Sequence, residues 1–282
     1  MSNTAESNVI GLSRRTQIRW EAQSFALLLR VGKDHPTVLW HYLTTNLRYL
    51  LVKFGVLFRA RKNVTEVRTE FEAEAAKGRF KELWFDTADA IIVLWCVTFA
   101  KVFDRADPVR ILEIGSWEGR STLFLLAYFW QGHLTAVDTW AGSEYHHYRD
   151  LQGLEARFDG NLAPFASRLT KRKGASVHVL AELLDEQQKF DVIYVDGSHF
   201  ADDVLTDAIS AWRLLEQGGL LIFDDFLWPG YPRARANPAW AINVFLKYRK
   251  GEYKILNVYS QLILQKKVAF TDQAAAELSA LR

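Results

Sequence analysis

Short apolar runs alternate with helix-forming segments over the second half of the chain. Four runs rich in Ile, Val and Leu predict buried strands, namely Arg110–Gly115, Leu134–Asp138, Val192–Asp196 and Leu220–Asp224. The segments between them predict helices, namely Ser121–Trp130, Leu151–Leu169, Val177–Gln187 and Asp202–Gln217. Strands of this composition that alternate with helices form a parallel sheet covered on both faces. The pattern therefore predicts an α/β protein with a doubly wound sheet.

The C-terminal part of the pattern predicts a helix followed by two strands. The helix covers about Trp240–Arg249, and the strands cover Tyr253–Tyr259 and Gln261–Lys267. A connection this short joins antiparallel neighbours, because parallel strands need a crossover of about a dozen residues or more. We therefore expect an antiparallel hairpin at one edge of the sheet.

Two further helices are predicted before the first strand. Thr65–Lys77 is rich in helix formers, and Gly78 stands where a glycine commonly ends a helix. Asp86 is expected to cap a helix that runs to about Phe103 and that should be buried, because it is apolar nearly all round. This helix contains Cys96, the only cysteine, which is expected to be a buried hydrophobic side chain. A single cysteine excludes disulfides within the chain.

The N-terminal part of the chain is basic. Residues 1–63 carry ten Lys and Arg against three Asp and Glu, whereas the net charge of the whole chain is only +2. Such asymmetry favours an anionic partner. The apolar stretch Val38–Phe58 has three interpretations: a transmembrane span, which Arg48 and Lys53 disfavour, a basic helix on a membrane surface, or a helix packed on the domain or on a second subunit.

These patterns divide the chain into two parts. Residues 1–83 are expected to form a basic helical extension, and residues 84–282 the α/β domain. The segment Met1–Ile10 is polar, so we expect no signal peptide. The expected location is the cytoplasm, with peripheral membrane contact and homo-oligomer formation as open alternatives.

The first two strand ends predict a nucleoside site, because open α/β sheets bind ligands beyond the carboxyl ends of their strands. The first end carries Glu113-Ile-Gly115-Ser-Trp-Glu-Gly119-Arg-Ser, in which the glycines permit a tight turn before a helix N-terminus. This spacing differs from the dinucleotide fingerprint and from the phosphate-binding loop of nucleoside triphosphate sites. The second strand ends at Asp138, where a carboxylate is placed to accept hydrogen bonds from both hydroxyls of a ribose.

Three carboxylates stand at the ends of the next two strands. Asp196 ends one strand, and Asp224 and Asp225 end the other. Adjacent strand ends lie about 5 Å apart, so the three carboxylates should converge. Such crowding is unfavourable without a cation, and carboxylate oxygens suit Mg²⁺ or a similar divalent ion. The alternative is that Asp196 or Asp225 caps a loop or pairs with Arg233 or Arg235.

Taken in order, these motifs resemble the class I S-adenosylmethionine-dependent methyltransferases. The glycine turn and Asp138 are similar to the cofactor site of that class. The run Asp191–Phe226 resembles the bacterial small-molecule O-methyltransferases related to macrocin O-methyltransferase and, more distantly, to catechol O-methyltransferase. The resemblance covers roughly residues 84–267. It implies a Rossmann-like fold with a mostly parallel seven-stranded sheet, S-adenosylmethionine as cofactor, and methyl transfer to a hydroxyl of a small-molecule acceptor.

The resemblance also implies roles for single residues. Those expected to bind the cofactor are Glu113, Gly115, Ser116 and Gly119 at the methionine, Asp138 and Trp140 at the ribose, Ala175 and Ser176 beside the adenine, and Asp196. The expected metal ligands are Asp196, Asp224 and Asp225, the last standing where the catechol-type enzymes have Asn. Ser176 is equally suited to cap the helix that begins there.

His199 is the expected catalytic base. It stands three residues after Asp196, where the catechol-type enzymes place a basic Lys. A His with an ordinary pKa of about 6.5 can take a proton from an acceptor hydroxyl. Ligation of the metal and a purely structural role are the alternatives. His146 and His147 lie in a polar segment that is a candidate for acceptor contact.

Three other functions stay open at this level. One is methylation of a nitrogen, which needs no metal. Another is methylation of RNA, in which the basic extension would bind the RNA. The apolar, helix-like run in that extension disfavours this function. The third is S-adenosylmethionine binding without catalysis, at a membrane.

Overall fold

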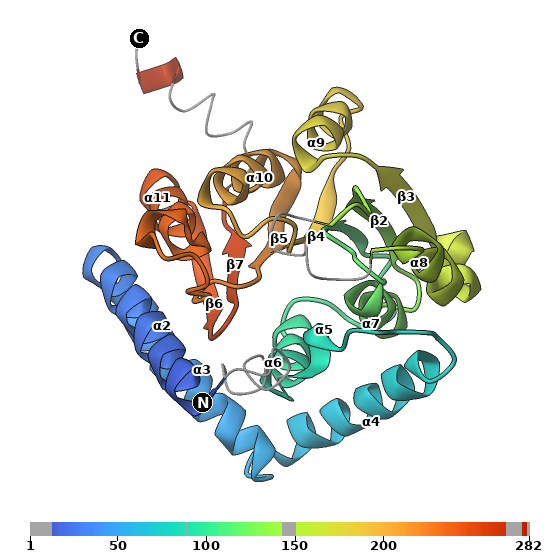
Figure 1. Cartoon of the computed structure of the whole chain (residues 1–282), viewed down its shortest axis with the longest axis horizontal. Coiled ribbons are helices and arrows are strands. Elements are labelled where there is room, and N and C mark those ends of the chain that lie inside the picture. The colour runs from blue at the N-terminus through green and yellow to red at the C-terminus, as the bar shows by residue number, and fades with distance from the viewer. Residues whose placement is uncertain (1–12, 88, 143–150, 269–277, 281–282) are drawn as a thin grey trace.

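The centre of the fold is one mixed sheet of seven strands. In a computed structural model, which describes residues 13–87, 89–142, 151–268 and 278–280, the strand order is β3-β2-β1-β4-β5-β7-β6 (Figure 1). The strands are β1 (Arg110–Ile114), β2 (His133–Asp138), β3 (Leu169–Lys173), β4 (Phe190–Val195), β5 (Leu215–Phe223), β6 (Tyr253–Val258) and β7 (Leu262–Lys266). The first five strands are parallel, and β7 runs antiparallel to both β5 and β6. The expected doubly wound sheet and its antiparallel hairpin are confirmed.

Helices cover both faces of this sheet (Figure 1). Those of the C-terminal part are α7 (Arg120–Tyr128), α8 (Leu154–Leu162), α9 (Ser176–Asp185), α10 (Ala201–Leu214) and α11 (Pro238–Tyr248). Those that precede β1 are α2 (Arg14–Asp34), α3 (Pro36–Lys53), α4 (Phe58–Ala75), α5 (Trp84–Thr87) and α6 (Asp89–Phe99).

Alternation along the strands divides the buried side chains into two cores. Leu112 of β1 points into a core that also holds Leu180 of α9 and Trp212 of α10. Its neighbour Ile111 points into the opposite core with Phe124 of α7. Since successive side chains of a strand face opposite ways, a run that is apolar at every position must be covered on both sides.

The N-terminal helices pack on this domain and extend its cores. Leu28 and Val31 of α2 belong to the core of α9 and α10, and Phe71 of α4 belongs to the other. Thr45 of α3 accepts a hydrogen bond at its Oγ1 from the backbone N–H of Val258 in β6, at 3.2 Å. The packed-helix interpretation of 38–58 therefore holds for the inner side of α3. Over the described residues, no helix combines the length and the apolar character needed to cross a membrane.

Two boundaries between helices and strands were predicted wrongly, because charged residues interrupt the apolar pattern there. The segment predicted as one helix, Leu151–Leu169, consists of α8 and a 3-10 helix, Ala163–Arg168, that leads into β3. β3 has the sequence LTKRK and lies at the sheet edge, so it needs no apolar run. The segment predicted as helix up to Gln217 becomes strand β5 at Leu215.

Asp86 does not cap the long helix expected after it. It lies within the short helix α5, and its Oδ2 accepts a hydrogen bond of 2.6 Å from Arg120 Nη2. The helix that follows, α6, ends at Phe99 and not near Phe103. It is buried, as expected, and so is Cys96 within it, whose thiol pKa burial raises to about 12.

Candidate active site

The turn after β1 depends on two glycines. Gly115 and Gly119 have φ values of +86° and +82°, a region that other residues enter only with strain. A Cβ on Gly115 would lie 2.1 Å from the carbonyl oxygen of Asp196, and one on Gly119 would lie 2.2 Å from Leu162 Cδ2. Gly115 therefore lies directly against the backbone that follows β4 and has no room for a side chain, whereas Gly119 packs against the Leu162 side chain of α8.

Asp138 ties this turn to the end of β2. Its Oδ2 accepts hydrogen bonds from the backbone N–H of Ser116 at 2.8 Å and of Trp117 at 2.9 Å. Its Oδ1 accepts one from the N–H of Trp140 at 2.6 Å. A carboxylate has about four acceptor positions, so three are used within the chain and one is left for a ligand. Asp138 lies beside the glycine turn, as the sequence predicted. That it also anchors the turn was not predicted.

The tryptophans on either side of Asp138 have unusual backbones. Trp117 and Trp140 have φ values of +48° and +49°. The indole N–H of Trp140 donates to the carbonyl oxygen of Trp117 at 3.0 Å, so the two loops are joined directly. Non-glycine residues in this region cost about 1–3 kcal/mol each and are concentrated at functional sites.

Glu113 lies below the turn, with no exposed surface. Its carboxylate accepts hydrogen bonds from the hydroxyls of Ser121, at 2.6 Å, and Thr122, both on α7. Burial raises the pKa of this carboxyl to about 7, against the opposing effect of the hydroxyls. In this arrangement Glu113 supports the start of α7 from beneath.

Glu113 gives a test through the pH dependence of stability. Its folded pKa of about 7 lies above the ordinary 4.5, so the folded state holds the proton more tightly than the unfolded state. The free energy of unfolding should therefore fall as pH rises from about 4.5 to 7, by about 2–3 kcal/mol from this group. Glu113→Gln should remove that part of the slope. Urea unfolding of both proteins across this range measures the difference, and parallel curves would contradict the assignment.

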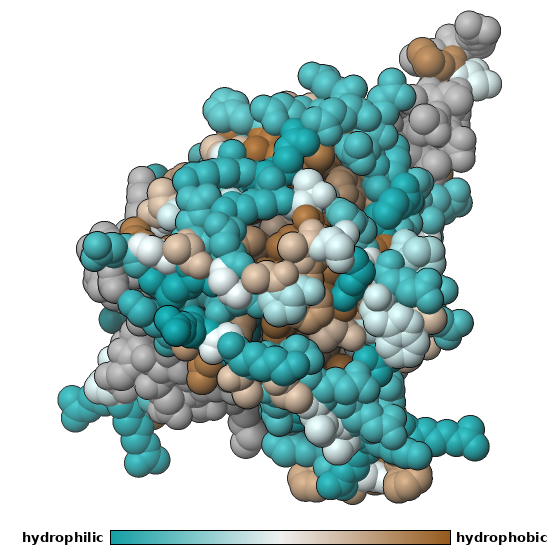
Figure 2. Space-filling model, turned by 90° about the vertical axis from the view of Figure 1, so that its right-hand side faces the viewer, coloured by the Kyte–Doolittle hydropathy of each residue, from teal (hydrophilic) through white to brown (hydrophobic). Residues whose placement is uncertain are grey.

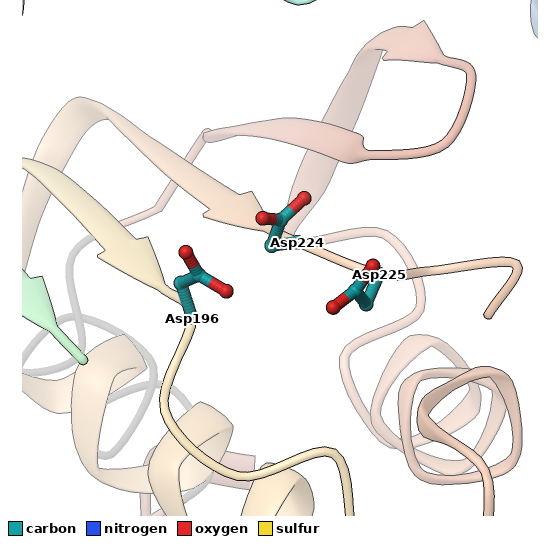
Figure 3. A group of neighbouring side chains, drawn as sticks. All are labelled: Asp196, Asp224 and Asp225. Carbon is teal, nitrogen blue, oxygen red and sulfur yellow. The ribbon is translucent and has the colours of Figure 1, made fainter. Parts of the chain in front are cut away.

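The three strand-end carboxylates converge as the sequence predicted. Asp196 follows β4, and Asp224 and Asp225 follow β5 (Figure 3). One oxygen from each lies within 4.8 Å of the others. Asp225 has a φ of +49°, a strained backbone that directs its side chain beside that of Asp224.

Neighbouring polar groups hold Asp224 in place. Its Oδ2 accepts a hydrogen bond from the Tyr194 hydroxyl at 2.6 Å, and its Oδ1 accepts one from Gln261 Nε2 at 2.9 Å. Gln261 is in turn fixed by the indole N–H of Trp95, which donates to its Oε1 at 2.6 Å. Sequence reasoning missed these three residues, because each lies in an apolar run or a turn whose pattern carries no chemical signal.

The electrostatics of the cluster favour a cation. Burial, and then the carboxylates beside it, raise the pKa of Asp196 well above its ordinary value. The pKa of Asp224 is also raised, first by burial and then by Asp225. Together with Asp225, these two carboxyls form an all-oxygen set of the kind that binds Mg²⁺ or a similar hard cation. The residues present therefore fit a divalent metal.

His199 lies against Asp225 and an aromatic group. Its Nε2 contacts Asp225 Oδ2. Burial alone would lower the pKa of the imidazole, but the Asp225 carboxylate outweighs it and raises the pKa. The Trp228 ring lies 4.7 Å from the imidazole and 6.1 Å from the ring of Trp20 on α2. The N-terminal helix thus reaches the surroundings of the candidate base, a contact that no motif indicated.

The loop before α9 also reaches this edge of the sheet. The backbone N–H of Gly174 donates to the carbonyl oxygen of Asp138 at 3.0 Å. The alternative role of Ser176 as a helix cap is wrong: Ala175 is the N-cap residue, and it makes no side-chain cap hydrogen bond. The Ser176 hydroxyl bonds Asp207, whose pKa burial raises to about 7. His146 and His147 lie outside the described residues.

A family model described as a methyltransferase domain matches residues 112–226. The match runs from β1 to just beyond β5 and includes the glycine turn, Asp138, the three carboxylates and His199. Over these residues the match agrees with the class expected from the motifs.

Individual proteins are similar over part of the chain. The mycinamicin VI 2''-O-methyltransferase of Micromonospora griseorubida is 28% identical over 137 residues, which are 45% of this chain and 30% of that enzyme. A structure of MycE methyltransferase with Mg, SAH and mycinamycin VI has a TM-score of 0.49 and 19% identity, and covers 73% of this chain and 54% of its own. The O-methyltransferase TomG from Streptomyces achromogenes has a TM-score of 0.45 and 17% identity, with coverages of 58% and 75%. This chain thus spans about a third of the curated relative and about half of the MycE chain.

Proposed function

We propose that this chain transfers the methyl group of S-adenosylmethionine to a hydroxyl of a small-molecule acceptor, with the assistance of a divalent cation. The observation that carries the proposal is the convergence of Asp196, Asp224 and Asp225 beside the glycine turn. The matched methyltransferase domain supports the cofactor, and the similarity to a mycinamicin VI 2''-O-methyltransferase supports oxygen in a small molecule as the acceptor.

The proposed cofactor site is the edge where β1 and β2 end. The methionine part would lie along the turn of Gly115, Ser116 and Gly119, at the N-terminus of α7. Asp138 would offer its remaining acceptor position to a ribose hydroxyl. Ala175 and Ser176 would lie beside the adenine, since Gly174 joins their loop to β2.

Methyl transfer has two requirements that the protein must meet. It must align the acceptor oxygen with the methyl carbon, and it must remove the proton of the hydroxyl. A divalent cation held by Asp196, Asp224 and Asp225 would lower the pKa of that hydroxyl. His199 would accept the proton, and Asp225 would orient the imidazole through its contact with Nε2.

Binding measurements test the cofactor part of the proposal. S-adenosylmethionine should bind in calorimetry and NAD should not. Asp138→Asn should weaken S-adenosylmethionine by about 10–100-fold, because a hydrogen bond to a charged acceptor contributes about 1.5–3 kcal/mol. Asparagine retains one oxygen, which can still accept from the N–H groups of Ser116 and Trp117, and it loses only the acceptor of the Trp140 N–H. The contacts to the turn should therefore persist.

A comparison of cofactor analogues separates ribose contact from support of the turn. The 2′-deoxy and 3′-deoxy forms of S-adenosylhomocysteine should each be measured with both proteins. If Asp138 binds a ribose hydroxyl, the analogue that lacks this hydroxyl should bind the wild type more weakly. Its affinity for Asp138→Asn should hardly differ from that of S-adenosylhomocysteine itself. Equal losses in both proteins for both analogues would refute the ribose contact and leave Asp138 as an anchor of the turn.

A further inference from the structure

Exposed apolar side chains gather on α2, α3 and the turn after α3. Of the nineteen large apolar residues that are exposed in the described parts of the chain, eleven lie between residues 18 and 58. They are Ile18, Phe25, Leu29, Trp40, Leu43, Leu47, Leu50, Phe54, Val56, Leu57 and Phe58. We call this set the outer stripe. The face of the molecule turned away from α2 and α3 is hydrophilic over most of its area (Figure 2).

The outer stripe lies along one side of each helix. In α3 and its C-cap residue Phe54, the members from Trp40 onward recur at intervals of three and four residues, which places them on a single side. Trp40 and Phe54 are 65% and 73% exposed. The other side of α3 holds the buried residues Thr45 and Val52. The stripe is therefore additional to the packing of the helix on the domain.

Exposed cations accompany the stripe, and most of them have no carboxylate partner in the described parts of the chain. Residues 13–63 carry ten Lys and Arg against only Glu21 and Asp34. Nine of the ten are exposed. Within the described ranges, no carboxylate pairs with the following six: Arg14, Arg15, Arg19, Lys33, Arg59 and Arg61. The side of the molecule that carries the outer stripe is apolar along its middle and positive along its margins. Such a side is complementary to a surface in which an apolar layer lies beneath anionic groups.

We propose that the outer stripe binds the surface of an anionic lipid bilayer. The apolar side chains would enter the boundary between headgroups and acyl chains, and the unpaired cations would lie at the lipid phosphates. Trp40 suits this boundary because its ring is apolar and its N–H is polar. A second copy of the chain fits less well, since a two-fold interface would bring two positively charged surfaces together.

The stripe and the candidate active site lie on opposite sides of α2. Trp20 follows Ile18 by two residues, which turns it by about 200° around the helix, and it contacts Trp228 beside His199. Lipid binding through the stripe would therefore leave the candidate site uncovered. The proposal does not depend on the catalytic one, and its test measures no turnover.

Flotation of the full chain with vesicles tests the proposal. The wild type should float with vesicles of mixed phosphatidylcholine and phosphatidylglycerol but not with phosphatidylcholine alone. Trp40→Ser/Leu43→Ser should lower the partition coefficient by more than about tenfold. Arg15→Gln/Lys33→Gln should lower it by about 25-fold, at about fivefold for each cation. Substitution is preferable to truncation, because Leu28 and Val31 of the same helix belong to the core.

Matched controls lie elsewhere on the surface. Trp130 and Leu278 are 51% and 64% exposed, so Trp130→Ser/Leu278→Ser removes similar apolar groups, and Lys77→Gln/Lys267→Gln removes two exposed cations. Both controls should float like the wild type. Three results would overturn the proposal: no flotation of the wild type, equal flotation with neutral vesicles, or a stable dimer in sedimentation that Trp40→Ser/Leu43→Ser dissociates while no variant changes flotation.

Discussion

Asp224→Asn is expected to lower methyl transfer by about 10³-fold or more while raising the melting temperature of the protein in excess chelator. The loss follows from removal of one charged ligand from a set of three, since a bound metal ion stabilises developing charge by several kcal/mol. The gain follows because three crowded carboxylates repel one another when no cation is present. A rise of about 2 °C or more corresponds to about 1 kcal/mol for a chain of this size.

The variant should keep the local structure. Asp224 is bonded to Gln261 through one oxygen and to Tyr194 through the other. Asparagine can accept from Gln261 with its oxygen and donate to the Tyr194 hydroxyl with its amide, because a hydroxyl both donates and accepts. The fold should therefore remain, and only the charge of the cluster should change.

Melting with and without Mg²⁺ provides a readout that needs no acceptor. Mg²⁺ should stabilise the wild type by about 2.7 kcal/mol at a hundred times its Kd, and it should stabilise Asp224→Asn far less. Asp185→Asn, which removes an exposed carboxylate at the end of α9, should respond to Mg²⁺ like the wild type. Full activity of the wild type in excess chelator would remove the metal from the proposed function and would revive methylation of a nitrogen.

The strand ends were predictable because local signals mark them. A buried strand must be apolar, and a parallel sheet brings its carboxyl ends to one edge, so Asp138, Asp196, Asp224 and Asp225 could be placed together from the sequence alone. β3 was missed for the opposite reason. An edge strand with half-exposed side chains, such as Leu169–Lys173, carries the same charged residues as a surface helix.

The supports of the site were not predictable, because they join parts of the chain that are distant in sequence. Gln261 reaches Asp224 from the β6–β7 connection, and Trp95 reaches Gln261 from α6. The identity of these residues does not indicate such a contact, since a Trp in an apolar helix would pack equally well in any hydrophobic core. Only the packing of both cores against β4 and β5 brings them together.

His199→Ala is expected to lower methyl transfer by about 10²–10⁴-fold if His199 is the base. The contact of its Nε2 with Asp225 leaves Nδ1 as the atom that would take the proton, in the way that a carboxylate fixes the tautomer of a catalytic histidine. The affinity for S-adenosylmethionine should stay within about twofold. The cofactor is proposed to bind at the turn, at Asp138 and at the loop before α9, and His199 belongs to none of these.

A series of phenols with decreasing pKa separates proton removal from support of the pocket. An acidic phenol ionises unaided, so the loss caused by His199→Ala should shrink steadily along the series. A purely structural histidine would cause the same loss with every acceptor, because displacement of Trp228 would disturb alignment regardless of acidity. His133→Ala, which removes an exposed imidazole at the opposite end of β2, should leave every rate unchanged. A loss that is constant across the phenols would assign His199 to the support of Asp225 and Trp228, and the acceptor proton would then have to leave by another route.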